Sequence, residues 1–269
     1  MVQSSEIAVL IPAYSPGSYI FDCFRSLAAQ DLPSEKFSVY IALNGPKEPF
    51  YSTLINFLSN NALDWQLFYL ENPGVSNARN FLIENSVEPY ICFLDDDDLL
   101  SENYLSSLLS VAGEETVGVS NVKVFDKNVC DSKVNYIGKC YSKMESKEVS
   151  IFRVRQYFSS PCAKIIHRNI IDIVRFDINL SKGEDGFFMA EISPRVVCIK
   201  KGMPESCYYV FQRPGSAIRK HVKVRSELLR ISYLIRRYAK MLFLPRYNKR
   251  FITSRILATL IQAKKVFSS

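Results

Sequence analysis

The chain has 269 residues, of which 48% are hydrophobic, and carries a formal net charge of +7. This length and composition indicate a globular protein in which one large α/β domain carries an appendage. No run of about 18 uncharged apolar residues occurs, which excludes a membrane-spanning helix. Seven cysteines without CxxC spacing, several of them inside apolar runs, indicate reduced thiols in a cytoplasmic protein.

Up to about residue 125, short apolar runs alternate with stretches of helical spacing, which is typical of a mostly parallel central sheet flanked by helices. We expect strands near residues 7–11, 37–43, 66–70 and 90–94. We expect helices near 18–30, 48–60 and 75–86. The first apolar run is short, follows no basic leader and is closed by Pro12, so we expect no secretion signal.

The pattern is less regular between residues 115 and 160, where Val, Tyr, Lys and Ser are mixed in strand-like pieces. We expect a mixed β extension there, with a mobile loop near 126–149. A last strand-like run, 207–212, is closed by Pro214 and Gly215. These features predict a catalytic domain over residues 1–219 and a separate tail over 220–269.

The tail concentrates the positive charge. From Lys220 onward the chain has 13 of its 34 Lys and Arg residues and only one acid, Glu227, so the tail is formally +12 and the rest −5. Basic and apolar residues alternate along it, as in a basic amphipathic helix that lies on an anionic membrane surface. We expect no nucleic-acid partner, because no zinc-finger, RNP or Gly-rich signature accompanies the charge. A helix packed on the domain with solvated cations is the alternative.

Four consecutive aspartates, at positions 95–98, directly follow the apolar run 90–94. At the carboxyl end of a buried strand, where ligands bind in α/β sheets, such a cluster repels itself unless a cation or hydrogen-bond donors compensate it. Oxygen ligands suit Mg²⁺ or Mn²⁺, which commonly bridges one or two carboxylates and a phosphate. The alternative is a solvated acidic turn or helix N-terminus.

Five separated segments together resemble glycosyltransferase family 2, the inverting nucleotide-sugar enzymes of the GT-A fold. They are Ile-Pro-Ala-Tyr at 11–14, Asn-Pro-Gly-Val-Ser-Asn-Ala-Arg-Asn at 72–80, Phe-Leu-Asp-Asp-Asp-Asp at 93–98, Phe-Asp at 176–177 followed by Gly-Glu-Asp at 183–185, and Arg-Pro-Gly-Ser at 213–216. The resemblance covers about residues 6–220. Each segment is a weak signal, and their order carries the assignment.

The resemblance implies that Asp95 and Asp97 form a DxD motif that binds Mn²⁺ or Mg²⁺. Two aspartates at i and i+2 of an extended backbone face the same side, so one can bind metal directly while the other acts through water or the ribose. Asp97 is then the expected direct ligand. Asp96 points elsewhere, with a capping role as plausible as nucleotide binding. His221 is a further candidate metal ligand, against the alternative of a structural or solvent-facing histidine.

The resemblance also implies a nucleotide site. Pro12 and Tyr14 are expected to flank the base, although Tyr14 fits equally well at the rim. Asn44 stands where relatives usually carry an aspartate that accepts a hydrogen bond from the base, and its amide oxygen accepts without a charge. Gly74 is expected to let the backbone approach the ligand.

Two arginines complete the expected donor site. Arg79 is expected to contact base or phosphate, unless it pairs on the surface with Glu84 or Glu88. Arg213, in a loop with Arg219, is expected to close over the diphosphate.

Asp185 is the expected general base, because inverting transfer needs a carboxylate that takes the proton of the attacking acceptor hydroxyl. Glu184 is expected to orient the acceptor or bind a nearby cation. The alternative makes both residues the first turn of a helix that runs to about residue 192. Lys164 lies in a segment where relatives often carry basic residues and receives no role.

The sequence therefore predicts a metal-dependent inverting glycosyltransferase with a nucleotide-sugar donor, a UDP-sugar by preference. The expected acceptor is a lipid-linked or other saccharide, in bacterial surface polysaccharide (O-antigen or capsule) synthesis at the cytoplasmic face of the membrane. The alternatives are a noncatalytic sugar-nucleotide-binding or scaffold subunit of the same fold and a nucleotidyltransferase. The absence of a Gly-rich phosphate loop after the first strand disfavours the latter.

Overall fold

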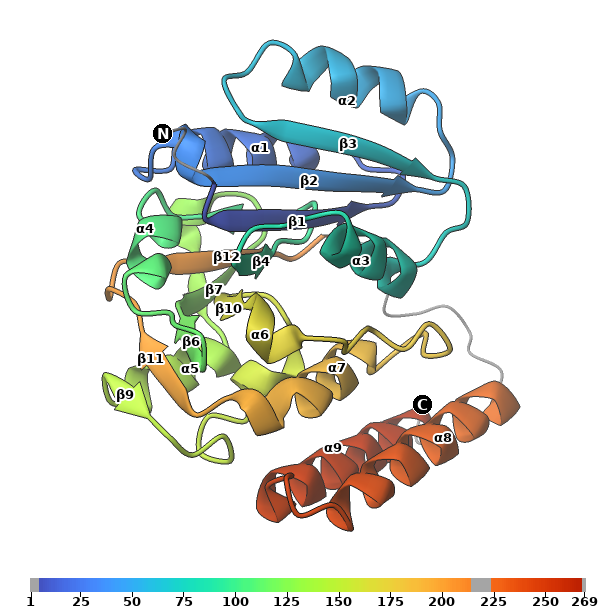
Figure 1. Cartoon of the computed structure of the whole chain (residues 1–269). Helices are drawn as coiled ribbons and strands as arrows, with labels where there is room; N and C mark the ends of the chain where they lie inside the picture. Colours follow the sequence, from blue (N-terminus) through green and yellow to red (C-terminus); the bar gives the residue numbers. More distant parts are fainter. Residues whose placement is uncertain (1–4, 214–223, 268–269) are drawn as a thin grey trace.

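The structure, a computed structural model, describes residues 5–213 and 224–267. Eight strands form its main sheet in the order β3-β2-β1-β4-β10-β6-β11-β9 (Figure 1). Their bounds are β1 Ile7–Ala13, β2 Phe37–Asn44, β3 Trp65–Leu70, β4 Tyr90–Phe93, β6 Thr116–Val119, β9 Lys147–Glu148, β10 Lys164–His167 and β11 Cys198–Lys201. The first four strands are parallel, whereas β10 is antiparallel to both neighbours. The expected GT-A-like α/β sheet is confirmed.

Helices flank this sheet, and the three expected in the first half of the chain are confirmed with shorter ends. The α-helices are α1 Tyr19–Ala28, α2 Phe50–Leu58, α3 Val75–Glu84, α4 Tyr104–Leu109, α5 Tyr136–Lys143, α6 Arg168–Ile171, α7 Glu184–Ile192, α8 Val224–Leu242 and α9 Lys249–Phe267. The 3₁₀ helices are η1 Ser34–Lys36, η2 Val129–Asp131, η3 Tyr157–Ser159 and η4 Ser193–Arg195. α3 packs on β1 and β2, whose residues are all buried. Burial on both faces explains why these two strands are continuous apolar runs.

A second sheet of four strands, in the order β5-β12-β7-β8, extends the fold next to the carboxyl end of β4. Its strands are β5 Leu99–Leu100, β7 Asn121–Phe125, β8 Lys133–Val134 and β12 Cys207–Phe211. β5 immediately follows the aspartate quartet and pairs with β12, which in turn pairs with β7. The second sheet therefore holds both the quartet and the segment that leads to Arg213.

The expectation of a mobile loop near 126–149 is wrong in its main part. This segment contains η2, β8, α5 and β9. Asn135 begins α5 as its N-cap, since its side-chain oxygen accepts hydrogen bonds from the backbone N–H groups of Ile137 and Gly138. Ile137 and Tyr141 are buried on the inner face of the helix. The mixed composition of this segment did not indicate α5, because the helix is stabilised by its N-cap and by the burial of its inner face.

The basic tail contains two helices, α8 and α9, which lie side by side below α7 in Figure 1. They pack on the rest of the protein: Tyr238 meets the edge of Phe187 at 5.5 Å between ring centroids, and Phe251 meets Phe158 at 5.6 Å. Arg237 forms ion pairs with Asp177 and Glu191. One face of the tail therefore packs on the domain, as the alternative interpretation of the tail predicted. No helix in residues 5–213 and 224–267 is long and apolar enough to cross a bilayer.

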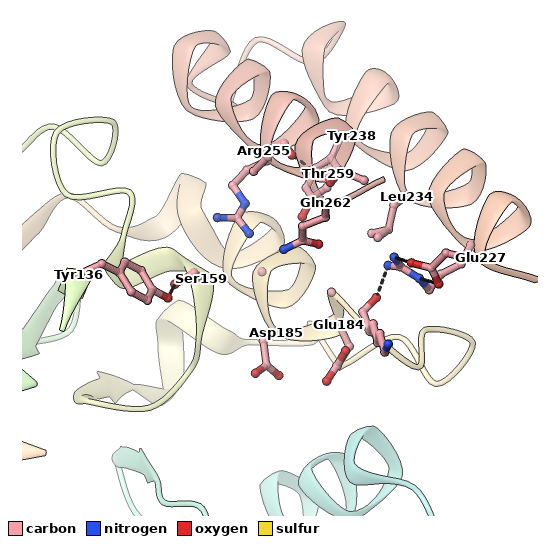
Figure 2. Close-up of a pocket in the computed structure, with 15 residues that line it drawn as sticks. Tyr136, Ser159, Glu184, Asp185, Glu227, Leu234, Tyr238, Arg255, Thr259 and Gln262 are labelled. Atoms are coloured by element: carbon pink, nitrogen blue, oxygen red, sulfur yellow. Dashed lines mark hydrogen bonds and ion pairs between the residues drawn. The ribbon is translucent and has the colours of Figure 1, made fainter. Parts of the chain in front are cut away.

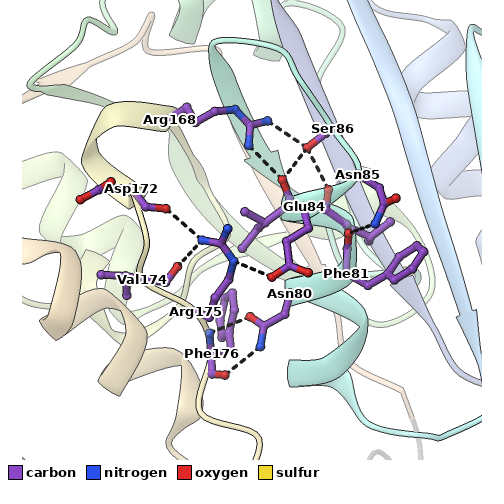
Figure 3. A network of polar contacts seen from close by, with 12 residues as sticks. Asn80, Phe81, Glu84, Asn85, Ser86, Arg168, Asp172, Val174, Arg175 and Phe176 are labelled. Carbon is purple, nitrogen blue, oxygen red and sulfur yellow. Dashed lines mark hydrogen bonds and ion pairs between the residues drawn. The ribbon is translucent and has the colours of Figure 1, made fainter.

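A side-chain network joins α3 to the segment between α6 and α7 (Figure 3). Asn80 accepts a hydrogen bond from the backbone N–H of Phe176 at 2.7 Å and donates to the Phe176 carbonyl at 2.9 Å. On the same helix, Glu84 pairs with Arg175 at 3.0 Å. The Phe176 ring stacks on Phe188 at 3.9 Å between centroids. We call the two hydrogen bonds between Asn80 and Phe176 the Asn80 clamp. Together with the stacking of Phe176 on Phe188, this clamp fixes α7, which begins with Glu184, relative to α3.

We predict that Asn80→Ala lowers the free energy of unfolding by about 1–3 kcal/mol, because the backbone N–H and C=O of Phe176 lose their partner in a half-buried site. Chemical denaturation measures the change. Asn85→Ala is the matched control, since Asn85 makes one exposed hydrogen bond to the Phe81 carbonyl of the same helix. Equal effects of the two substitutions would contradict the clamp.

Candidate active site

The carboxyl ends of β1, β2 and β4 open into one cavity of about 1130 Å³. Every predicted site residue that lies in the described part of the chain lines it: Pro12, Tyr14, Asn44, Gly74, Arg79, Asp95, Asp96, Asp97, Glu184, Asp185 and Arg213. His221 and Arg219 lie outside the described residues. Segments more than 100 residues apart in the chain therefore meet at one edge of the sheet, as expected for ligand sites in α/β folds.

The four aspartates after β4 have different surroundings. Asp98 is 4% exposed and accepts a hydrogen bond from the backbone N–H of Phe211 at 2.8 Å, which ties the quartet to the end of β12. Asp97 pairs with Arg213, with 2.7 Å between Oδ2 and Nε. Asp95 pairs with Arg79 at 2.9 Å. The quartet is thus a built, partly compensated cluster rather than the solvated acidic turn considered above.

Asp96 is one of three aspartates of the quartet whose charged form is disfavoured by burial. Burial raises its pKa to about 7, and the charges of Asp97 and Asp95 add to that rise. Burial also raises the pKa values of Asp97 and Asp98. Three neighbouring carboxyls therefore resist ionisation together, and an added positive charge in the cavity relieves that strain.

Arg79 projects from α3 between two carboxylates and is 3% exposed. Its Nη1 donates to Asp185 Oδ1 at 2.5 Å and its Nη2 donates to Asp95 Oδ1 at 2.9 Å. The Phe176 ring lies 5.3 Å from the guanidinium carbon. This buried, two-armed ion pair joins the quartet to the predicted general base.

The alternative of a surface Arg79 paired with Glu84 or Glu88 is wrong. Glu84 pairs with Arg175, and Glu88 accepts a hydrogen bond from the Tyr40 hydroxyl at 2.9 Å. Arg79 lies on the buried face of α3. The sequence pattern around Arg79 did not indicate that this side chain would be buried.

Asn44, at the end of β2, acts as a cross-link between two loops. Its amide nitrogen donates to the Ala13 carbonyl at 2.8 Å, and its amide oxygen accepts from the Gly74 N–H at 2.9 Å. Gly74 has a φ of 153°, which side-chain-bearing residues rarely adopt. The amide therefore uses both of its ends to shape the edge of the cavity, a structural task that the sequence did not indicate.

Tyr14 lies at the cavity rim with 58% of its surface exposed. Its ring lies directly against Gly45, where an added Cβ would be 2.6 Å from a ring carbon. A tyrosine in this open position has a free face against which a planar group can stack. Both the base-flanking and the rim interpretation of Tyr14 fit this position.

Glu184 and Asp185 begin α7 directly after Gly183. Burial raises the pKa of Asp185; Arg79 opposes the rise, and the charge of Asp95 adds to it. Burial also raises the pKa of Glu184, with a further contribution from Asp185. Both residues are indeed in the first turn of a helix, and they line the cavity as well.

Three residues that the sequence left without a role support the site. Tyr19 accepts a hydrogen bond from Arg213 Nη1 at 2.7 Å, and its ring lies 4.7 Å from that guanidinium carbon. Tyr208 accepts from the Asp95 N–H at 3.2 Å. Lys164 is 1% exposed and donates to the carbonyls of Ser160 and Cys162, and burial lowers its pKa to about 8. No sequence motif marks these contacts, which arise only from the fold.

The described residues contain no group of three or more His, Cys, Asp or Glu side chains that could hold a metal ion by themselves. The quartet fits a different arrangement, in which one or two carboxylates bind Mg²⁺ or Mn²⁺ and a substrate phosphate supplies further oxygens. Asp97 and Asp95 line the open cavity and are available for this purpose.

The sequence matches the family described as "Glycosyl transferase family 2" over residues 8–172. Similar curated proteins include glycosyltransferase GlyA of Streptococcus pneumoniae, 24% identical over 76% of this chain and 30% of that protein, and poly(ribitol-phosphate) β-N-acetylglucosaminyltransferase TarS of Staphylococcus aureus, 21% identical over 78% of this chain and 36% of that protein. The chain thus spans about a third of the length of these relatives.

Solved structures share the fold. The crystal structure of S. aureus TarS in complex with UDP-GlcNAc has a TM-score of 0.75 at 19% identity and covers 95% of this chain and 71% of that one. The mannosyltransferase PcManGT from Pyrobaculum calidifontis, in complex with GDP-Man and Mn²⁺, has a TM-score of 0.62 at 13% identity, covering 99% and 74%. Since the family match extends over more than half of the sequence, the chain belongs to glycosyltransferase family 2.

Proposed function

We propose that this protein transfers a sugar from a nucleotide-diphosphate donor to a hydroxyl acceptor with inversion at the anomeric carbon. The observation that carries the proposal is the Arg79 bridge, which holds Asp95 of the quartet and Asp185 at α7 on the same cavity. Such a reaction needs one group that binds the diphosphate and one that removes a proton. Asp95 and Asp185 are the carboxylates proposed for these two tasks, and both are bonded to the guanidinium of Arg79.

On the donor side, Asp97 and Asp95 would hold Mn²⁺ or Mg²⁺, since both line the cavity that would receive the diphosphate. The cation, when bound, offsets the charge that develops on the departing nucleoside diphosphate. Arg213, which pairs with Asp97 and lines the same cavity, would donate hydrogen bonds to the diphosphate. Tyr14 and Pro12 flank the base, while Asn44 and Gly74 fix the shape of the loop edge beneath it. We propose a UDP-sugar, since TarS binds UDP-GlcNAc with a similar fold.

On the acceptor side, Asp185 takes the hydroxyl proton as the acceptor oxygen attacks the anomeric carbon. The new bond joins that oxygen to the sugar, the bond to the diphosphate breaks, and the electron pair leaves with the nucleoside diphosphate. Burial favours this role because a raised pKa brings the carboxylate closer to the pH at which a base works best. Arg79 keeps the carboxylate ionised and oriented.

We predict that Asp185→Asn lowers transfer at least about 100-fold, because the amide cannot accept the proton. The amide oxygen still accepts from Arg79, so the dissociation constant for UDP-sugar with Mn²⁺ stays within about threefold. Release of UDP measures turnover, and a thermal-shift titration with and without a chelator measures donor binding.

Asp22→Asn is the control, since Asp22 is exposed and pairs with Arg25 away from the cavity. Full transfer activity of the Asp185→Asn variant would contradict the assignment of Asp185 as the general base. A wild-type protein that binds the donor and transfers nothing to a panel of saccharide acceptors would support the noncatalytic alternative, and released pyrophosphate would support a nucleotidyltransferase.

The pKa shift of Asp185 predicts the pH dependence. The base works only when ionised, so kcat/KM falls as the pH drops through its pKa. Because that pKa is raised, we expect the acid limb above pH 4, the region of an ordinary aspartate. Arg79 opposes the rise, so Arg79→Gln moves the limb to higher pH. A wild-type acid limb at or below about pH 4 would contradict the assignment.

We further propose that the tail attaches the protein peripherally to an anionic membrane, where a saccharide of the bacterial surface, such as an O-antigen or capsule chain, is assembled on a lipid. Exposed apolar residues remain on its outer side; they are Leu228, Leu229, Phe243, Leu257, Leu260 and Ile261. The helical spacing of 257, 260 and 261 puts these three on one face of α9. Exposed cations such as Arg236 and Lys240 accompany them.

We predict that the protein cosediments with phosphatidylglycerol vesicles and not with phosphatidylcholine vesicles, since each cation near an anionic surface contributes roughly 1 kcal/mol. Phe243→Ser weakens this binding because Phe243 is 86% exposed and loses its place in the interface. Val87→Ser, at an equally exposed valine outside the tail, serves as the control. Equal binding to both vesicle types would argue against electrostatic attachment.

A further inference from the structure

A second cavity, of about 480 Å³, lies between the start of α7 and the C-terminal helices α8 and α9 (Figure 2). Glu184 and Asp185 line both cavities. The remaining walls come from α8 and α9 on one side and from Tyr136 and Ser159 on the other. The C-terminal helices thus complete a compartment that reaches the proposed base.

Arg255 of α9 enters this compartment without a counter-charge. Its guanidinium lies against Gly186, where an added Cβ would be 2.1 Å from Nη2. Its guanidinium has a hydrogen bond with the Tyr238 side chain, a neutral partner, while its Nε is buried and has no hydrogen-bond partner. No carboxylate of the described residues forms an ion pair with it. A buried, unpaired donor on a cation is costly unless a ligand satisfies it.

The other charges around the cavity leave Arg255 with a positive surplus. Glu227 is paired with Arg230, and Asp185 with Arg79. Glu184 makes no ion pair in the described residues, and burial raises its pKa. Lys182 lines the cavity at its exposed lip. Lys182 also interacts with Glu227, whose pKa it helps to lower, so Arg255 is the cation of this compartment that has no carboxylate in an ion pair with it among the described residues.

Neutral polar groups surround these cations. Gln262 and Thr259 face the cavity from α9, and the Tyr136 hydroxyl lies 2.9 Å from the Ser159 hydroxyl across from them. Tyr136 is 58% exposed and offers a ring face for a sugar ring. Amide, hydroxyl and aromatic groups of this kind recognise polyhydroxylated ligands through directional hydrogen bonds and apolar contact.

We propose that this second cavity is the acceptor subsite and that it binds a saccharide carrying a phosphate group, with Arg255 pairing to the phosphate. The inference rests on the proposed glycosyl transfer and adds the chemical class of the acceptor. Asp185 lines the same cavity, with its carboxylate pointing away from Arg255 across the start of α7, so the reacting hydroxyl belongs to a part of the saccharide distant from the phosphate (Figure 2). A planar guanidinium suits phosphate because it can donate two parallel hydrogen bonds to its oxygens.

The test measures binding of a phosphorylated disaccharide and of its unphosphorylated counterpart by titration calorimetry, without donor, on the full chain. We expect the wild type to bind the phosphorylated compound at least 10-fold more tightly. Arg255→Gln removes that preference and leaves the affinity for the neutral compound within about twofold. Arg250→Gln, an exposed position on the same helix, changes neither affinity.

Equal wild-type affinity for the two disaccharides overturns the inference, whether or not the variants fold. A preference that survives in Arg255→Gln overturns the role of Arg255. A lipid-linked disaccharide diphosphate in vesicles forms a second arm: tighter binding of this compound than of the soluble phosphorylated disaccharide assigns the phosphate to the lipid anchor, and the reverse order assigns it to the glycan. Because binding is measured without turnover, failure of the subsite is distinguishable from an absence of UDP release, which would overturn glycosyl transfer itself.

Discussion

The buried Arg79 guanidinium is the interaction on which the site depends. It is held between Asp95 and Asp185, which come from segments separated by 90 positions of the chain. Removing Arg79 would leave two carboxylates facing each other in a partly buried cavity, with no cation between them. Three parts of the fold supply this contact: α3 carries the arginine, Asp95 follows the end of β4, and the hydrogen bonds of Asn80 to Phe176 fix the segment that leads to α7.

The charges around this bridge divide the cavity into two regions. On one side, burial and mutual repulsion raise the pKa values of Asp96, Asp97 and Asp98, an arrangement that favours an incoming cation. On the other side, Asp185 borders a compartment that contains Arg255, a cation without an ion pair among the described residues. A donor that arrives with a cation complements the aspartate quartet, and an acceptor with a phosphate complements Arg255. These charges therefore favour one orientation of donor and acceptor in the site.

The sequence predicted the sheet and most of the cavity because both depend on local patterns. Apolar runs identified the parallel strands, and the acidic quartet marked the end of β4. It did not predict that Asn44 would tie two loops with its amide, nor that Arg79 would be buried, because these outcomes depend on partners far along the chain. Helix α5 was missed for a different reason: its Asn135 cap is a local signal that was overlooked, whereas the burial of its inner face depends on the fold. The position of Arg255 over Gly186 follows only from the packing of α9.

Anomalous diffraction from crystals grown with Mn²⁺ and UDP tests the central arrangement most directly, because the signal locates the cation without any assumption about turnover. The account predicts a manganese peak beside Asp97 or Asp95, in contact with the diphosphate, while Arg79 still spans Asp95 and Asp185. A peak remote from the quartet, or a nucleotide bound away from the ends of β1 and β2, would contradict it.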